Sequence, residues 1–166
     1  VKKACERSGR NFQDITIIAV SKTKPLSDVE ELLSHGVMEF GENKVQEMVD
    51  KYEHVSKPVH WHLIGHLQTN KVKYIVDKAC LIHSVDSVHL AKEIEKEAAK
   101  KGVVAKVLLE VNIAQEETKF GIREDEVYAL IDAIKDMPHV HVMGRMTIAP
   151  FVENPEENRC LLYTSD

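Results

Sequence analysis

The sequence is poor in the residues that mark secreted, fibrous or membrane-spanning proteins. Only three of its 166 residues are cysteine, seven are glycine and five are proline. The cysteines lie far apart without a C-x-x-C pair, so no disulfide framework or cysteine-based zinc motif is indicated, and a reducing cytoplasm fits best. No apolar run approaches the roughly 20 residues that a membrane-spanning helix needs, and the first residues lack a signal-peptide pattern. We therefore expect a cytoplasmic protein with no membrane partner.

An excess of basic residues is also missing. The formal net charge is −5, and the lysines and arginines are scattered among acidic residues, so nucleic acid is not an expected partner. The fractions of hydrophobic residues (43%) and charged residues (30%) are those of an ordinary globular domain. A single domain is the expectation for a chain of this length.

Apolar runs of strand length alternate with segments of helical periodicity along the whole chain. The helical segments are expected at residues 27–36, 44–55, 69–78, 87–101 and 123–137, with Ser27 as the N-cap of the first. The strands are expected at residues 15–21, 38–42, 60–65, 81–85, 105–113 and 140–148. Six strands that alternate with helices predict a parallel α/β sheet, either open or closed into a barrel.

Two absences bear on the choice between an open sheet and a barrel. The turn after the first strand has no glycine, which argues against a dinucleotide-binding open sheet. A (β/α)₈ barrel needs two strands more than the sequence provides. The chain begins at Val1 rather than methionine, and residues 160–166 continue the preceding helical pattern poorly. We expect one incomplete barrel domain at residues 1–159 followed by a doubtful tail at residues 160–166.

Lys22 is the first candidate for chemistry, because it ends the β-branched run of residues 15–21 and precedes Pro25. A run without polar alternation is typical of a strand buried on both faces, and strand periodicity places Lys22 on the face of Ile18 and Val20. A desolvated lysine can form a Schiff base with a carbonyl ligand, although a solvated lysine at a strand end is the more common case.

Further candidates lie where the other apolar runs stop, because functional groups of a barrel collect at the carboxyl ends of its strands. Asn43 could bind a ligand oxygen or ring nitrogen, or could equally be the N-cap of the next helix. His60, His62 and His66 could bind a metal, as in some barrel hydrolases, but no later strand end supplies the further ligands. We therefore expect no metal site. The other strand-end groups are Ile64, Gly65, Ser84, Asp86, Asn112 and Met146.

Four short motifs follow one another along the chain, and their order and spacing are informative. They are Ala19–Pro25 (AVSKTKP), Phe40–Asn43 (FGEN) with VQE at 45–47, Trp61–Gly65 (WHLIG) with LQTNK at 67–71, and VNI at 111–113 with KFGI at 119–122. In these motifs the sequence resembles the pyridoxal phosphate homeostasis proteins, single-domain relatives of the alanine racemase barrel. The resemblance covers residues 11–159.

The resemblance implies a (β/α)₈ barrel of pyridoxal phosphate fold type III, truncated here to about six βα units. It further implies that Lys22 carries pyridoxal 5′-phosphate as an internal aldimine. Asn43, His62, Ile64 and Gly65 are expected to line the cofactor ring, and Met146 is a further expected contact. The phosphate-binding residues of the family are expected beyond residue 166. Gly144–Met146 departs from the family with Arg145 in place of leucine, so Arg145 either faces outward or signals a sequence error.

The resemblance also implies that the protein is not an enzyme but buffers the cofactor or delivers it to apoenzymes, and that the full-length form is monomeric. Two alternatives remain open, namely an amino-acid racemase and, less favoured, the metal-dependent hydrolase. A racemase needs a second acid or base, and Tyr52, Tyr74, Tyr128 and Tyr163 are not placed at strand ends. Lys119, in the loop after the fifth strand, could provide a second amine near the mouth of the barrel, where the carboxyl ends of the strands meet. An exposed loop lysine is nevertheless the more common case.

Overall fold

The computed structural model describes residues 1–114 and 119–159. Its centre is one sheet of six parallel strands. The strands are β1 (Ala19–Val20), β2 (Glu39–Glu42), β3 (His60–Leu63), β4 (Ala79–Val85), β5 (Ala105–Glu110) and β6 (Val140–Met146). The prediction of six parallel strands alternating with helices is confirmed. The predicted tail at residues 160–166 lies outside the described residues.

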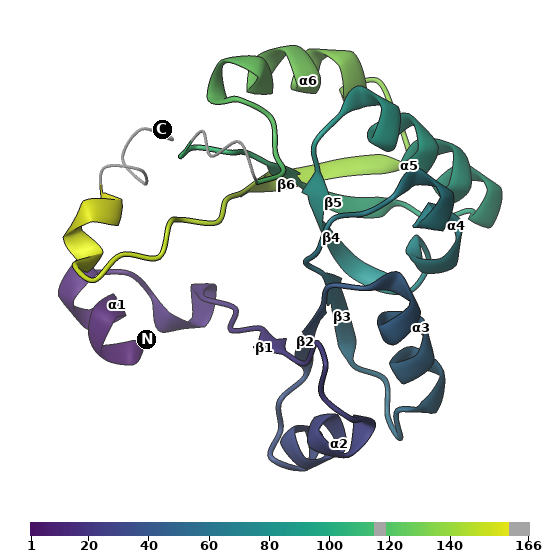
Figure 1. Ribbon diagram of the computed structural model, residues 1–166. Helices are drawn as coiled ribbons and strands as arrows, with labels where there is room; N and C mark the ends of the chain where they lie inside the picture. The colour runs from purple at the N-terminus through teal and green to yellow at the C-terminus, as the bar shows by residue number, and fades with distance from the viewer. Residues whose placement is uncertain (115–118, 160–166) are drawn as a thin grey trace.

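Each strand is followed by a helix or a short helical turn. The α-helices are α1 (Lys2–Ser8), α2 (Leu26–Ser34), α3 (Val45–His54), α4 (Val72–Ile75), α5 (Val88–Lys101) and α6 (Val127–Ile134). Short 3₁₀ turns are η1 (Phe12–Asp14), η2 (Thr69–Lys71), η3 (Glu124–Glu126) and η4 (Pro155–Asn158). In Figure 1, α3, α4, α5 and α6 follow one side of the sheet, whereas α1 lies on the other side.

The strand order is β1-β2-β3-β4-β5-β6, so every strand pairs with its predecessor in the chain. This sequential parallel order is that of a (β/α) barrel wall and excludes the doubly wound arrangement, in which the order reverses. Within the described residues β1 and β6 are the two edges. The strand face opposite α3–α6, which carries Val20, Gly41 and His62, is called the inner face below.

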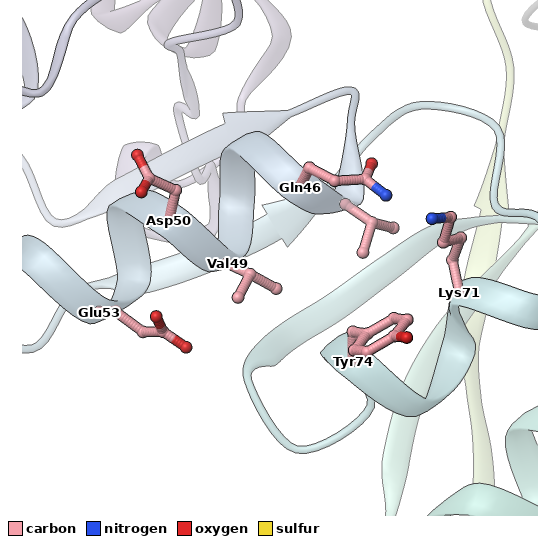
Figure 2. A pocket seen from close by; sticks show the side chains of 7 residues that line it. Gln46, Val49, Asp50, Glu53, Lys71 and Tyr74 are labelled. Carbon is pink, nitrogen blue, oxygen red and sulfur yellow. The ribbon is translucent and has the colours of Figure 1, made fainter.

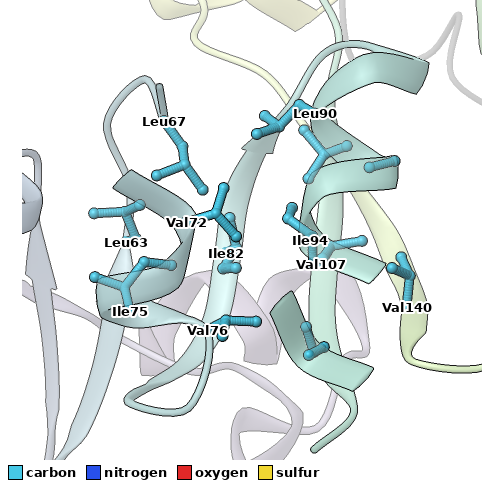
Figure 3. Packing of buried hydrophobic residues seen from close by; sticks show 14 of the residues in the cluster. Leu63, Leu67, Val72, Ile75, Val76, Ile82, Leu90, Ile94, Val107 and Val140 are labelled. Atoms are coloured by element: carbon cyan, nitrogen blue, oxygen red, sulfur yellow. The ribbon is translucent and has the colours of Figure 1, made fainter. Parts of the chain in front are cut away.

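The hydrophobic core lies between the sheet and α3–α6 (Figure 3). Every second residue of β5, namely Ala105, Val107 and Leu109, is buried in it. Their partners come from helix positions spaced three or four apart, such as Leu90, Ala91, Ile94 and Ala98 of α5. This combination of a period of two in the strand and about 3.6 in the helix places the apolar residues of both elements in one layer.

The first strand is shorter and more exposed than expected. We predicted a strand over residues 15–21 buried on both faces, but β1 contains only Ala19 and Val20, and Val20 is 51% exposed. The reason is its position at the sheet edge, where β2 pairs with one side only. A β-branched composition favours extended backbone in this segment, but ladder hydrogen bonds require a neighbouring strand.

Three helix predictions need correction. Helix α4 has four residues preceded by a 3₁₀ turn, against the ten predicted at 69–78, and α6 begins at Val127 rather than 123. Helix α2 begins at Leu26 with Pro25 as its N-cap, so Ser27 lies inside the first turn. Among the described residues, no helix combines the length and apolar character needed to cross a membrane.

Candidate functional site

The turn that carries Lys22 lies at the carboxyl end of β1 and is held in place from two sides. The Ser21 N–H donates to the Gly41 carbonyl of β2 (3.0 Å), and the Thr23 N–H donates to the Glu47 carboxylate of α3 (3.1 Å). Thr23 has φ of +62°, a strained conformation for a β-branched residue. The hydrogen bond from Thr23 is the main reason that the pKa of Glu47 lies below its usual value. The backbone around Lys22 is thus fixed by its neighbours.

A buried ion pair lies directly beneath this turn. Lys51 Nζ lies 2.6 Å from Glu42 Oε1 and donates to the Ser21 carbonyl (2.8 Å), while Ser21 Oγ donates to Glu42 (2.7 Å). Glu42 is fully buried and the Lys51 side chain is 7% exposed. Glu42, although it ends β2, therefore supports the turn from the helix side of the sheet and does not face the mouth. Sequence periodicity gave no sign that Lys51 is buried.

Lys22 itself is exposed. The register pairs Val20 with Gly41, so the alternation of β1 places Val20 on the inner face, and Lys22 follows two residues later. The sequence left open whether the Lys22 amine is desolvated or solvated, and the described residues do not bury it. The physical reason is that β1 is an edge strand, with a neighbour on one side only. The amine is accessible to a ligand from the mouth.

Asn43 and Gly65 lie in close contact at the ends of β2 and β3. The Ile64 N–H donates to the Glu42 carbonyl (2.9 Å), and a Cβ on Gly65 would collide with the backbone of Asn43. Ile64 packs over Gly41 together with Ile18, where an added Cβ would lie 3.0 Å from both side chains. Glycine is therefore required at 65 for this approach, and an apolar floor forms next to the Asn43 amide. Helix α3 has no side-chain cap, and its N-cap residue is Lys44 rather than Asn43.

His62 is on the inner face, where it pairs with Gly41, and it is 5% exposed. Its Nε2 lies 2.8 Å from Glu39 Oε2 and its Nδ1 lies 2.9 Å from His83 Nε2. Burial, followed by the neighbouring His62 ring, lowers the pKa of His83 to about 4. The two ring nitrogens of His62 thus contact Glu39 and His83. Contact between His62 and the cofactor ring stays a prediction.

Met146 ends β6 at the opposite edge of the sheet from Lys22 and pairs with Glu110. Glu110 is 7% exposed, and burial, followed by the charge of Asp86, raises its pKa. A hollow of about 140 Å³ at this end is bordered by Glu110, Asn112, Lys119 and Phe120. The structure thus groups Asn43, Ile64 and Gly65 beside the Lys22 turn, whereas Met146 and Lys119 lie five strands and four strands away, respectively. Arg145 is exposed, which agrees with the outward orientation.

The groups behind the two alternative functions are dispersed. The three described tyrosines, Tyr52, Tyr74 and Tyr128, belong to helices and are 41%, 45% and 76% exposed. His60 binds Glu39 (2.6 Å), whereas His66 stacks on Phe120 at a ring separation of 4.0 Å. His60 and His62 thus share Glu39, whereas His66 lies apart from them on Phe120, so the three histidines considered for a hydrolase do not converge.

A larger hollow of about 430 Å³ lies between α3 and α4, on the helix side of the sheet. Figure 2 shows its lining side chains, among them Gln46 and Glu53 of α3 facing Lys71 and Tyr74. The helices separate it from the strand ends that carry Lys22 and Asn43. It is therefore distinct from the candidate site at the mouth.

The sequence of residues 4–161 matches the profile of the alanine racemase N-terminal domain. The match agrees with the structure, which has the six βα units of a barrel wall and a lysine at the end of β1. A pyridoxal phosphate homeostasis protein from Aquifex aeolicus is 45% identical over 160 residues, which cover 96% of this chain and 70% of the relative. Its counterpart in Escherichia coli is 35% identical, over 89% of this chain and 65% of the relative. The chain belongs to the pyridoxal phosphate homeostasis protein family.

Solved structures agree with this assignment. PipY from Synechococcus elongatus without pyridoxal phosphate superposes with a TM-score of 0.86 at 31% identity, over 99% of this chain and 77% of PipY. The same protein with pyridoxal phosphate bound gives 0.84 at 28% identity over the same shares. Alanine racemase from Clostridium difficile, at 16% identity and a TM-score of 0.77 over 92% of this chain and 43% of the racemase, shares the fold. The predicted truncated barrel and the predicted family are confirmed.

Proposed function

We propose that the chain binds pyridoxal 5′-phosphate through a Schiff base on Lys22 and buffers or delivers this cofactor rather than turning over a substrate. The observation that carries the proposal is the fixed turn at the end of β1, which presents an accessible amine next to the Asn43–Gly65 contact. PipY, a structural neighbour of this chain, has been solved with pyridoxal phosphate bound. The relatives from Aquifex aeolicus and Escherichia coli are both named pyridoxal phosphate homeostasis proteins.

The residues at the mouth fit the chemistry of the cofactor. The neutral Lys22 amine would attack the cofactor aldehyde, form a C=N bond and release one water molecule, and the reverse hydrolysis would free the cofactor again. Ile18 and Ile64 offer an apolar surface for the ring, and the Asn43 amide offers a donor and an acceptor for its polar edge. Gly65 keeps this surface close to β2. His62 and Met146 remain predicted contacts.

Trapping the lysine tests the covalent assignment. The chain is incubated with pyridoxal phosphate, reduced with borohydride and digested, and the peptides are mapped by mass spectrometry. We expect the pyridoxyl group on Lys22. Lys22→Ala should lose the visible chromophore, whereas Lys24→Ala, which removes another exposed lysine of the same turn, should retain it. A modified peptide elsewhere, or an unchanged chromophore in Lys22→Ala, would refute the assignment.

A transfer assay tests delivery. The loaded chain is mixed with an apoenzyme that depends on pyridoxal phosphate, in the presence of a scavenger that removes free cofactor. We expect the apoenzyme to recover activity from the loaded chain under conditions in which the same amount of free cofactor does not reactivate it. Equal recovery from both sources would argue against delivery.

A racemisation assay separates this function from the racemase alternative. Incubation of the loaded chain with L-alanine should give no D-alanine, because the described tyrosines lie on the outer helices and provide no second acid or base at the mouth. Formation of D-alanine that disappears in Lys22→Ala would contradict the proposal of a non-catalytic role.

A further inference from the structure

A second group of chemically reactive side chains lies on the inner face, closer to the amino ends of the strands. Glu39 of β2, His62 of β3 and Cys80 of β4 come from three adjacent strands. One oxygen, nitrogen or sulfur atom from each lies within 4.8 Å of those of the other two. A carboxylate, an imidazole and a thiol on neighbouring strands form a donor set that transition metals bind.

The register of β3 and β4 explains how Cys80 joins this group. Trp61 pairs with Ala79 and His62 pairs with Leu81, so three residues of β4 oppose two residues of β3. Such a bulge inserts one residue without a partner and re-aims its side chain. Cys80 is the inserted residue. The bulge thus brings its thiol to His62 and Glu39, an arrangement that sequence alternation alone would not provide.

The surrounding contacts orient two of the three side chains. His62 Nδ1 contacts His83 Nε2, which leaves Nε2 directed at Glu39 (2.8 Å). The second oxygen of Glu39 contacts His60 Nδ1 (2.6 Å). Metal-binding histidines and carboxylates in proteins typically have such outer partners, which fix the tautomer and the ring orientation. Here the outer partners are His83 and His60.

We propose that Glu39, His62 and Cys80 form a binding site for a borderline transition-metal cation, with Zn²⁺ as the expected ion. The cation would bind between His62 Nε2 and Glu39, with the single ring proton of His62 on Nδ1, and it would displace the proton of the Cys80 thiol to solvent. Three protein ligands leave a fourth position for water or a small ligand. The site departs from the sequence-based expectation of no metal, and it does not depend on cofactor binding at Lys22.

The contact with His83 favours the tautomer that metal binding requires. His83 Nε2 lies 2.9 Å from His62 Nδ1 and can accept its N–H, which leaves His62 Nε2 available to the metal. Of the three proposed ligands, Cys80 borders a hollow of about 460 Å³ that His60 and Trp61 also line.

Cobalt titration in the absence of pyridoxal phosphate tests the proposal, because Co²⁺ occupies zinc sites and a cobalt–thiolate bond gives an absorption band of its own. We expect one Co²⁺ per chain, the thiolate band, and displacement by Zn²⁺. Cys80→Ser should lose the band, whereas Cys5→Ser, which removes the other described cysteine, should keep it. His83→Gln should weaken binding by about 10–100-fold through the loss of an outer partner. Absence of the band, or the same band in Cys80→Ser, would overturn the proposal.

A measurement on the unmodified chain covers the case in which Cys80→Ser does not fold. Zn²⁺ should slow the alkylation of Cys80, followed by peptide mass spectrometry, without changing that of Cys5. Equal alkylation of Cys80 with and without Zn²⁺ would overturn the proposal. Lys22→Ala serves to separate the two sites, since it should abolish cofactor binding and leave Zn²⁺ protection of Cys80 intact.

Discussion

At the scale of single residues, buried polar side chains determine how the mouth is built. Glu42 and Lys51 are charged residues in the layer between sheet and helix, and both contact Ser21, which immediately precedes Lys22. A buried pair of this kind is costly to form from two solvated ions, but removal of one partner is costlier still, because it leaves the other charge uncompensated. The position of the Lys22 turn therefore depends on residues that never contact a ligand.

Substitution of Lys51 should be strongly destabilising. In Lys51→Met the Glu42 carboxylate loses its only described cationic partner, and we expect the free energy of unfolding to fall by about 3–5 kcal/mol. Urea denaturation measures this change. The control is Lys100→Met, which removes an exposed partner of Glu97 and should cost less than about 1 kcal/mol. Similar losses in the two variants would contradict the structural role given to Lys51.

His83 should make stability depend on pH in the acid range. It contacts His62 of β3, which in turn contacts Glu39 of β2, and Cys80 precedes it on the same strand. Its pKa is about 4 in the folded chain against 6.5 in the unfolded chain. Between these values the unfolded state binds the extra proton, so stability should fall as pH decreases from about 6.5 to about 4.

Urea denaturation at several pH values in that range, with a chelator present, measures the effect. His83→Gln cannot take up the proton in either state and should remove this part of the pH dependence. An identical slope in the variant and the unmodified chain would contradict the assignment.

At the scale of elements, sequence patterns predicted the alternation of strands and helices because each core strand and each longer helix carries its own apolar periodicity. The sequence patterns failed where contacts with a segment distant in the sequence determine the local structure or the burial of a residue. Residues 15–18 are β-branched but lack ladder pairing at the sheet edge, and Lys51 reads as a solvated helix residue although Glu42 binds it in the interior. The group formed by Glu39, His62 and Cys80 depends on a bulge between two strands, for which the separate segments give no signal.

The two serines near helix starts offer a test at this scale. Ser87 is the N-cap of α5 and its hydroxyl accepts the Leu90 N–H at 3.2 Å, whereas Ser27, predicted as a cap, lies inside α2 and is exposed. Ser87→Ala should lower the free energy of unfolding by about 1 kcal/mol. Ser27→Ala should change it by less than about 0.5 kcal/mol. Urea denaturation of both variants measures these changes. Equal losses of unfolding free energy in the two variants would contradict the assigned caps.

At the scale of the whole molecule, the described sheet has two free edges. Both β1 and β6 pair with one neighbour only, and apolar side chains such as Val20 and Met143 are about half exposed on them. Unpaired backbone groups beside exposed apolar surface favour pairing with another chain. The chain is therefore expected to self-associate.

Sedimentation at several concentrations measures this tendency. We expect the average mass to rise with concentration, and Met143→Lys, which places a charge on the β6 edge, to shift the chain toward monomer. The control is Leu32→Lys, which adds the same charge at an exposed apolar position of helix α2 rather than on an edge strand, and should leave the association unchanged. A monomer at all concentrations would contradict the prediction.

The strand order has a consequence for synthesis on the ribosome. Because each strand pairs with the one that precedes it, a nascent chain can add one βα unit at a time to a surface that has already emerged, and no unit waits for a distant partner. Each addition closes a loop of only a few tens of residues, which keeps the entropic barrier of every step small. The barrel wall can thus grow in the direction of translation, from β1 toward β6.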